Sequence, residues 1–268
     1  MDSLTGKIAL VTGASRGVGR GVALGLAEFG ATVYITGRTV TGVGSLEETV
    51  AEADALHGSC CPIECDHLDD GASTAAVARV VDAEGRLDIL VNSAWGGYEN
   101  MLEDGEFTYA NPFWEQPIWR WDAMFAGGVR VAFVCSRAAA RQMVAQRSGL
   151  IVNVSSLAGR HYELNAIYGT AKSAIDRLTA DMALELAPHE VAAVALYPGL
   201  VRTEKVLEAD FFDLSNSESP QFSGRAVAHL AMDSRVLDKS GGVVVAAELA
   251  MEYGFTDIDG KQPQPLTD

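Results

Sequence analysis

Short apolar segments alternate with longer segments of helical spacing along nearly the whole chain. This alternation predicts an α/β fold, with a doubly wound parallel sheet of about seven strands and helices on both faces. The strand-like segments are 7–13, 32–37, 61–66, 87–94, 149–156, 191–199 and 241–249. Helical spacing is found at about 19–30, from near 46, and at about 73–84, 119–147 and 168–187.

The chain is expected to be one domain over residues 1–268, because no repeat, low-complexity tract or linker divides it. Three segments interrupt or extend the alternation. Residues 95–121 form an aromatic-rich loop. Residues 203–235 are expected to be loop and helix without a strand, as a substrate-loop region. Residues 261–268 are expected to be a frayed or docked tail.

The acidic composition of the chain makes two classes of binding partner unfavourable. The chain has 36 acidic and 20 basic residues and a net charge of −16, so nucleic acid and anionic membranes are poor partners. The N-terminus has no basic region and the apolar runs are short, so neither a signal peptide nor a membrane span is expected. We also expect reduced, buried thiols, no metal site and a cytoplasmic location. The cysteines are Cys60, Cys61, Cys65 and Cys135.

A glycine-rich turn, TGASRGVG, lies between an expected buried strand and an expected helix. Gly13 can take the tight turn, while Gly17 and Gly19 let backbone amides approach a pyrophosphate and let the helix pack on the strand. The alternative is a glycine-rich turn that binds no ligand. The position between strand and helix favours a dinucleotide site.

Five motifs together resemble the short-chain dehydrogenase/reductase family. They are the Gly-x-x-x-Gly-x-Gly turn, NSA at 92–94, NVSS at 153–156, YGTAK at 168–172 and PGLVRT at 198–203. The resemblance covers nearly the whole chain and implies a single Rossmann-like domain with a nicotinamide cofactor. Within the family, ATVYITGR, FWEQP and DIDG are most similar to the group typified by dehydrogenase/reductase member 1.

Tyr168 and Lys172 are four residues apart, so on a helix they share one face. An ordinary surface pair is worth only about 0.2–1 kcal/mol, too little to make a phenol acidic near neutral pH. The resemblance implies instead that Tyr168 is the general acid or base and that Lys172 lowers its pKa and binds the nicotinamide ribose. It also implies that Ser156 polarises the substrate oxygen, with Ser155 as the alternative. A water-poor cleft and the charge of the oxidised nicotinamide would supply the remaining energy.

The second expected strand ends in ITGRT, with no carboxylate to accept the ribose hydroxyls of NAD. Arg38 follows this strand and Arg16 lies in the glycine turn, and two guanidinium groups suit a phosphate dianion. We therefore expect NADP(H) to be preferred over NAD(H). The resemblance further implies that Asp66 contacts the adenine, Asn92 lines the ribose side and Thr203 holds the nicotinamide carboxamide. The expected cofactor-binding residues are Gly13, Ser15, Arg16, Gly17, Val18, Gly19, Arg38, Asp66, Asn92, Ala94, Tyr168, Lys172, Pro198, Gly199, Val201 and Thr203.

Two positions depart from the family pattern. Gly128 replaces the usual asparagine, which helps to hold a proton-relay water, and Trp95 replaces a usual glycine. Neighbouring glycines at 127 and 128 favour a bulge in the helix, whose free carbonyl could hold the same water. Trp95 is expected either to line a pocket for a bulky apolar substrate or to belong to an ordinary loop core. His161 and Tyr162 are further candidates for the substrate pocket, with a structural role as the alternative.

The sequence favours an NADP(H)-dependent carbonyl reductase or alcohol dehydrogenase acting on a small-molecule carbonyl or alcohol. The alternative is a cofactor-binding protein with little chemistry, used for regulation or assembly. The missing asparagine favours that alternative, whereas the complete set of Ser156, Tyr168 and Lys172 opposes it. Enoyl reductases of this family usually have a wider tyrosine-to-lysine spacing, so the spacing of four residues here argues against enoyl reduction. The resemblance also implies a homodimer or homotetramer.

Overall fold

Seven parallel strands form the central sheet of the computed structural model, which describes residues 3–103, 105–209 and 212–266. The strand order β3-β2-β1-β4-β7-β8-β9 runs outward from β1 on one side and outward from β4 on the other. This is the predicted doubly wound arrangement, and it brings the carboxyl ends of the strands to one edge. The strands are β1 (Ile8–Thr12), β2 (Thr32–Gly37), β3 (Ser59–Glu64), β4 (Ile89–Asn92), β7 (Gly149–Val154), β8 (Val191–Tyr197) and β9 (Val243–Val245).

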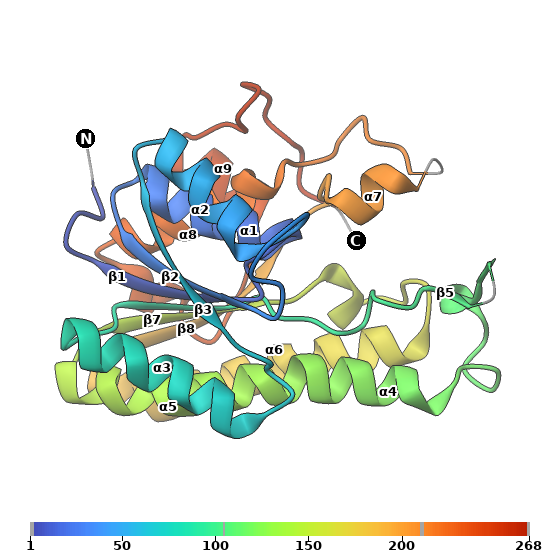
Figure 1. The fold of residues 1–268 in the computed structure, drawn as a ribbon, viewed down its shortest axis with the longest axis horizontal. Helices are drawn as coiled ribbons and strands as arrows, with labels where there is room; N and C mark the ends of the chain where they lie inside the picture. Colours follow the sequence, from blue (N-terminus) through green and yellow to red (C-terminus); the bar gives the residue numbers. More distant parts are fainter. Residues whose placement is uncertain (1–2, 104, 210–211, 267–268) are drawn as a thin grey trace.

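Helices cover both faces of the sheet (Figure 1), and each layer buries its own apolar cluster against the strands. Strand β8, second from one edge of the sheet, is buried at every residue, as expected for a sheet covered on both sides. One layer contains α1 (Gly17–Glu28), α2 (Leu46–Ala55), α8 (Pro220–Met232) and α9 (Ala246–Tyr253). The other contains α3 (Asp70–Glu84), α5 (Val131–Gln146) and α6 (Ala166–Leu186).

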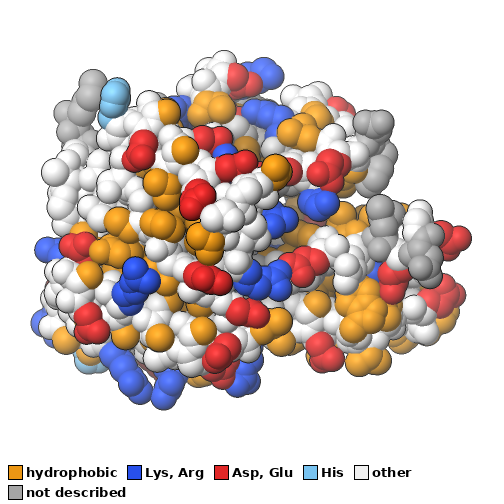
Figure 2. Space-filling model, in the orientation of Figure 1, with side chains coloured by type: hydrophobic (Ala, Val, Ile, Leu, Met, Phe, Trp, Pro, Cys, Tyr) orange, Lys and Arg blue, Asp and Glu red, His pale blue; other side chains and the backbone are white. Residues whose placement is uncertain are grey.

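The aromatic-rich segment 95–121 forms a lobe on the right of Figure 1, held together by a buried arginine. Arg120 is fully buried and donates to the backbone carbonyls of Thr108 at 3.0 Å and Asn100 at 3.1 Å. It also forms an ion pair with Glu103 at 3.4 Å. Figure 2 shows hydrophobic side chains on the surface of this lobe, and the exposed ones include Phe113, Trp114, Ile118, Trp119 and Trp121. Its short elements are β5 (Leu102–Glu103), β6 (Glu106–Phe107) and η1 (Thr108–Ala110).

One helical stretch, Ile118–Gln146, follows the lobe and contains the bulge expected at the two glycines. It consists of α4 (Ile118–Met124), a π-helical turn over Phe125–Arg130, and α5. By length and composition alone this stretch is apolar enough to cross a membrane, with a mean hydropathy of 1.3. The lengths of the apolar runs in the sequence did not predict such a helix. Half of this window, 50%, is buried inside the protein. Residues of α5 pack into the core against the sheet.

Near the C-terminus, one boundary differs from the prediction. The expected strand 241–249 is shorter, because β9 ends at Val245 and α9 begins at Ala246. Alanine, glutamate and leucine in AAEL are strong helix formers, which explains the early switch. In the described part of 203–235, α7 (Glu204–Glu208) and α8 are the α-helices, as expected for a loop and helix region.

The tail, described as far as residue 266, is docked rather than frayed. The Asn216 side chain donates to the backbone carbonyl of Gln264 at 3.0 Å and accepts from its N–H at 2.8 Å. Pro263, the residue directly before Gln264, is buried. The tail therefore covers the segment that follows α7.

All four cysteines are free thiols. Burial raises the pKa of Cys60 and of Cys135 to about 12, so these two stay protonated and unreactive near neutral pH. Among the described residues, no group of three or more histidine, cysteine, aspartate or glutamate side chains could hold a metal ion.

Candidate active site

The end of β1 holds the glycine turn against the loop that follows β4. The Thr12 hydroxyl accepts hydrogen bonds from the backbone N–H groups of Ser93 and Ala94, each at 3.1 Å. Gly13 has a φ of +66°, and a Cβ there would lie 2.7 Å from the Cα of Ala94. Only glycine allows this approach, so two predicted cofactor residues, Gly13 and Ala94, lie in contact.

Helix α1 presents backbone donors at the carboxyl edge of the sheet. The Gly17 N–H donates to the Glu204 carboxylate at 3.0 Å, so this helix N-terminus binds an anionic group within the fold. The Thr203 methyl group lies 3.5 Å from the position of a Cβ at Gly17, which places Thr203 over the glycine turn. These residues fit a pyrophosphate, which would displace Glu204 from the N–H.

The two arginines predicted to meet a 2′-phosphate lie at the end of β2. Arg16 precedes α1, and its guanidinium donates to the Thr39 hydroxyl at 3.5 Å. Arg38 forms an ion pair with Glu99 from the lobe, and both side chains are more than half exposed. Sequence reasoning missed Glu99, because a partner from a distant loop leaves no local signal.

The phenol of Tyr168 lies beside two other hydroxyl groups of the site. Asn165 caps α6 by accepting from the Tyr168 N–H at 2.8 Å, which places Tyr168 in the first turn. The buried Tyr168 hydroxyl accepts a hydrogen bond from Tyr98 at 2.8 Å and hydrogen-bonds to Ser156. Ser155 instead donates to a backbone carbonyl of α6 at 3.3 Å. Of the two serines, Ser156 therefore faces the phenol.

Burial raises the pKa of Tyr168 above its ordinary value. The hydrogen bonds with Ser156 and Tyr98 act in the opposite direction, because they stabilise the ionised phenol. These two hydroxyl groups therefore lower the pKa of Tyr168, which is the effect that the family resemblance assigned to Lys172.

Lys172 is itself buried, and the loss of hydration lowers its pKa to about 7. Its Nζ donates to the backbone carbonyl of Val154 at 3.2 Å and lies 4.0 Å from the ring centre of Trp95. The indole face therefore stabilises the ammonium by a cation–π contact. Lys172 and Trp95 together form the inner wall of the site.

Trp95 fills the space that a side chain at position 128 would need. A Cβ at Gly128 would lie 2.4 Å from a carbon of the Trp95 ring. The ring also packs edge-on against Tyr168, with centroids 5.9 Å apart. The two departures from the family pattern are therefore one exchange of volume, in which the indole replaces the asparagine side chain.

Comparison with known proteins shows the family of this chain. A family model described as short chain dehydrogenase matches residues 7–210. This chain belongs to the short-chain dehydrogenase family. Dehydrogenase/reductase SDR family member 1 of Mus musculus is 43% identical, covering 96% of this chain and 85% of that protein. Its Homo sapiens counterpart is 40% identical, covering 97% and 86%. A metagenomic short-chain oxidoreductase in complex with NADP has a TM-score of 0.73 and 30% identity, covering 90% and 96%.

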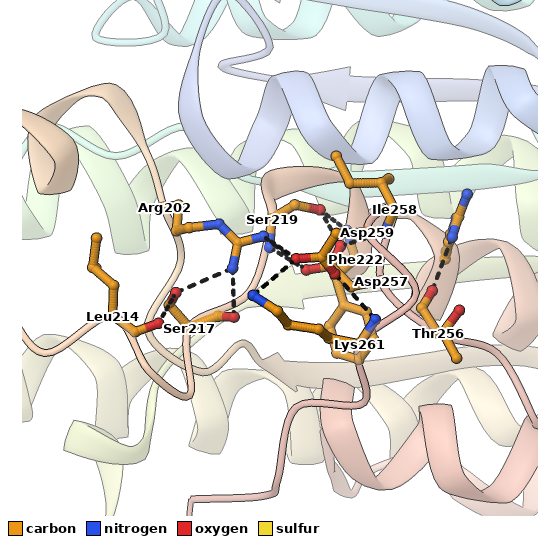
Figure 3. Close-up of polar contacts among 11 residues, drawn as sticks. Arg202, Leu214, Ser217, Ser219, Phe222, Thr256, Asp257, Ile258, Asp259 and Lys261 are labelled. Atoms are coloured by element: carbon orange, nitrogen blue, oxygen red, sulfur yellow. Dashed lines mark hydrogen bonds and ion pairs between the residues drawn. The ribbon is translucent and has the colours of Figure 1, made fainter.

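In this short-chain dehydrogenase, the PGLVRT segment is anchored by a polar network shown in Figure 3. Arg202 donates to the Ser217 carbonyl at 2.7 Å and to the Asp257 carboxylate at 3.1 Å. Asp257 also accepts from the Ser219 N–H at 2.7 Å. The network ties the loop that carries Thr203 to the C-terminal segment, which fixes its position over the glycine turn.

The remaining predicted cofactor residues fall into three groups. The Asn92 amide points into the core, where it donates to Asn153 at 2.8 Å and to Ser136 at 2.9 Å, and Val18 packs against the core. If Asn92 lies beside the ribose, its backbone and not its side chain would therefore make the contact. Gly19 lies in α1, where a Cβ would come within 2.3 Å of the Gly13 carbonyl oxygen. The others follow the carboxyl ends of β1, β3 and β8, and they are Ser15, Asp66, Pro198, Gly199 and Val201.

Of the residues after β7, Tyr162 points away from the site and Glu163 points toward it. Tyr162 is 75% exposed and its hydroxyl donates to the Leu164 carbonyl at 3.1 Å. His161 is also exposed and acts electrostatically on Glu163. The Ser156 hydroxyl lies 3.5 Å from a carboxylate oxygen of Glu163. Sequence reasoning missed Glu163, although its place in the loop between two catalytic motifs could have suggested it.

We expect Gly128→Asn to destabilise the fold by about 1–3 kcal/mol, because any side chain at 128 overlaps the Trp95 ring. Trp95→Gly alone should leave a cavity, and the double variant should recover much of both losses. Chemical unfolding of the four proteins should give a coupling energy above about 1 kcal/mol. Pairing Gly128→Asn with Trp119→Gly is the control and should be additive. Additive losses for the Trp95 pair would contradict the exchange of volume.

Proposed function

We propose that this chain is an NADP(H)-dependent oxidoreductase that reduces a carbonyl group or oxidises the corresponding alcohol. The observation that supports it most is the buried Tyr168 phenol, hydrogen-bonded to Ser156 and Tyr98 on the helix that buries Lys172. Burying a phenol and an amine together costs free energy, and such groups cluster at sites that do chemistry. The family that the chain belongs to supports the same reaction class.

The proposed roles follow from the positions of the side chains. The glycine turn and Thr203 would hold the cofactor, with Lys172 on the ribose. When bound, the nicotinamide supplies the hydride for reduction or accepts it in oxidation. The substrate oxygen would lie between the hydroxyls of Ser156 and Tyr168. Ser156 polarises the carbonyl, and Tyr168 donates its proton to the oxygen as the carbonyl carbon gains the hydride.

The preference for NADP(H) rests on charge at the end of β2. No acid follows this strand directly, and Arg16 and Arg38 lie beside it. Glu99 pairs with Arg38, so a 2′-phosphate would compete with one carboxylate for that guanidinium. The phosphate dianion carries more charge and offers more acceptor oxygens, which favours it in the exchange.

NADPH should bind more tightly than NADH, and Arg38→Asp should reverse this order. Glu99→Gln, which frees Arg38 from its ion pair, should tighten NADPH several-fold and leave NADH nearly unchanged. Calorimetric titration of the parent protein and of the two variants with both cofactors measures the six dissociation constants. Equal affinities of the parent protein for the two cofactors would refute the preference.

Tyr168→Phe should reduce turnover at least about 100-fold while NADPH still binds, because only the proton donor is removed. The control is Tyr34→Phe, since the Tyr34 hydroxyl bonds to Glu84 outside the site. Activity is followed by nicotinamide absorbance on a panel of ketones. Near-normal activity of Tyr168→Phe would exclude it as the acid, and a binding protein without chemistry would show no turnover in the parent.

Tyr98→Phe should move the pH dependence of alcohol oxidation to higher pH. Oxidation needs Tyr168 as a base, so the rate rises with pH through its pKa. Tyr98 donates to Tyr168 and lowers this pKa, so removing the Tyr98 hydroxyl should raise the pKa and move the rising limb of the profile to higher pH.

The matched control is Tyr109→Phe, which removes a buried hydroxyl that forms no hydrogen bond with Tyr168. It should leave the rising limb of the pH profile in place. A profile that stays fixed in Tyr98→Phe, or moves to lower pH, would rule out the role given to Tyr98.

A further inference from the structure

Glu163 places a carboxylate at the substrate side of the catalytic hydroxyls. It lies in the loop between β7 and α6, and one of its oxygens is 3.5 Å from the Ser156 hydroxyl. Its negative charge also acts to raise the pKa of Tyr98, Tyr109 and Tyr168. The carboxylate therefore belongs to the space that surrounds the reacting oxygen.

Two cations that act on residues of this site, Lys172 and Arg120, are directed elsewhere. Lys172 donates to Val154 and faces the Trp95 ring, on the inner wall. Arg120 acts on Tyr109 but is fully buried in the lobe and paired with Glu103.

His161 is the group whose positive form acts on Glu163, and it is an exposed histidine. Burial raises the pKa of Glu163 above its ordinary value, and the contacts with Ser156 and His161 act in the opposite direction, which stabilises the carboxylate. The substrate side of the site is thus acidic.

The distances set which part of a substrate meets Glu163. A carbonyl oxygen that accepts from Ser156 lies about 2.8 Å from its hydroxyl, and hence within about 6 Å of the carboxylate oxygen. A substituent two bonds from the carbonyl carbon can bridge this gap. The ring of Tyr98 lies 5.9 Å from that of Tyr168, and the ring of Tyr109 lies 6.2 Å from it. Aromatic rings beside a carboxylate favour a cationic nitrogen, quaternary ammonium groups included.

We propose that Glu163 selects carbonyl substrates that carry a positively charged nitrogen two bonds from the carbonyl carbon. This rests on the proposed function, because it concerns the substrate of the same site. The carboxylate attracts the cation and repels an anionic substituent at that position. The net charge of −16 adds long-range attraction for such substrates.

The test compares two phenyl ketones of the same shape. One carries a permanently charged trimethylammonium group on the carbon next to the carbonyl, and the other carries an uncharged tert-butyl group there. The ratio of their kcat/KM values with NADPH should fall about tenfold in Glu163→Gln, because the two ketones differ in charge and not in shape. Glu106→Gln removes an exposed carboxylate from the lobe and should leave the ratio unchanged.

Binding gives a readout that does not need turnover. On Tyr168→Phe loaded with NADPH, the charged ketone should lose about tenfold more affinity than the neutral one when Glu163→Gln is added. If the parent reduces neither ketone but this binding difference is found, the selection stands and the proposed reaction falls. Equal losses for both ketones would mean that Glu163 orients the Ser156 hydroxyl instead, and would overturn the selection. An unchanged ratio together with unchanged affinities would also overturn it.

Discussion

Buried hydrogen bonds between the last residues of three central strands fix the register on which the site depends. Thr12, Asn92 and Asn153 are aligned across β1, β4 and β7. Asn92 donates to Asn153 at 2.8 Å, and Thr12 accepts from the backbone that follows β4. A slip of one residue would leave these groups unpaired in a dry interior, at a cost of about 1–3 kcal/mol each. The glycine turn, the loop of Trp95 and the loop of Ser156 all start from these strand ends, so one register positions them together.

Burial then sets the charge state of the two titrating groups at the centre. It raises the pKa of Tyr168 and lowers that of Lys172 to about 7, so in both residues the uncharged form is favoured. A protonated phenol is the form that gives a proton to a carbonyl oxygen. Oxidation requires the opposite form, and the hydroxyls of Ser156 and Tyr98 supply part of its stabilisation. The surroundings of Tyr168 thus favour the proton-donating state.

The sheet and the motif residues could be predicted because their signals are local. Most strands contain a short apolar run, and parallel topology by itself brings Gly13, Ser156 and Tyr168 to one edge. The contacts of Glu99 with Arg38 and of Glu163 with Ser156 could not be predicted, because they join segments through loops whose paths have no periodic pattern. The bulge was predicted from the glycines at 127 and 128, but the contact with the Trp95 ring that requires glycine at 128 was not predicted.

The fit between Trp95 and Gly128 also limits the order in which the two residues can change. With any side chain at 128, an indole at 95 meets a Cβ at 2.4 Å, so tryptophan cannot arrive first without disrupting the helix or the loop. Losing the side chain at 128 first leaves a cavity, a milder defect that the indole can later fill. Once both changes are in place, reverting position 128 alone recreates the overlap. A route from the family's usual pair to this one therefore passes through glycine at both positions.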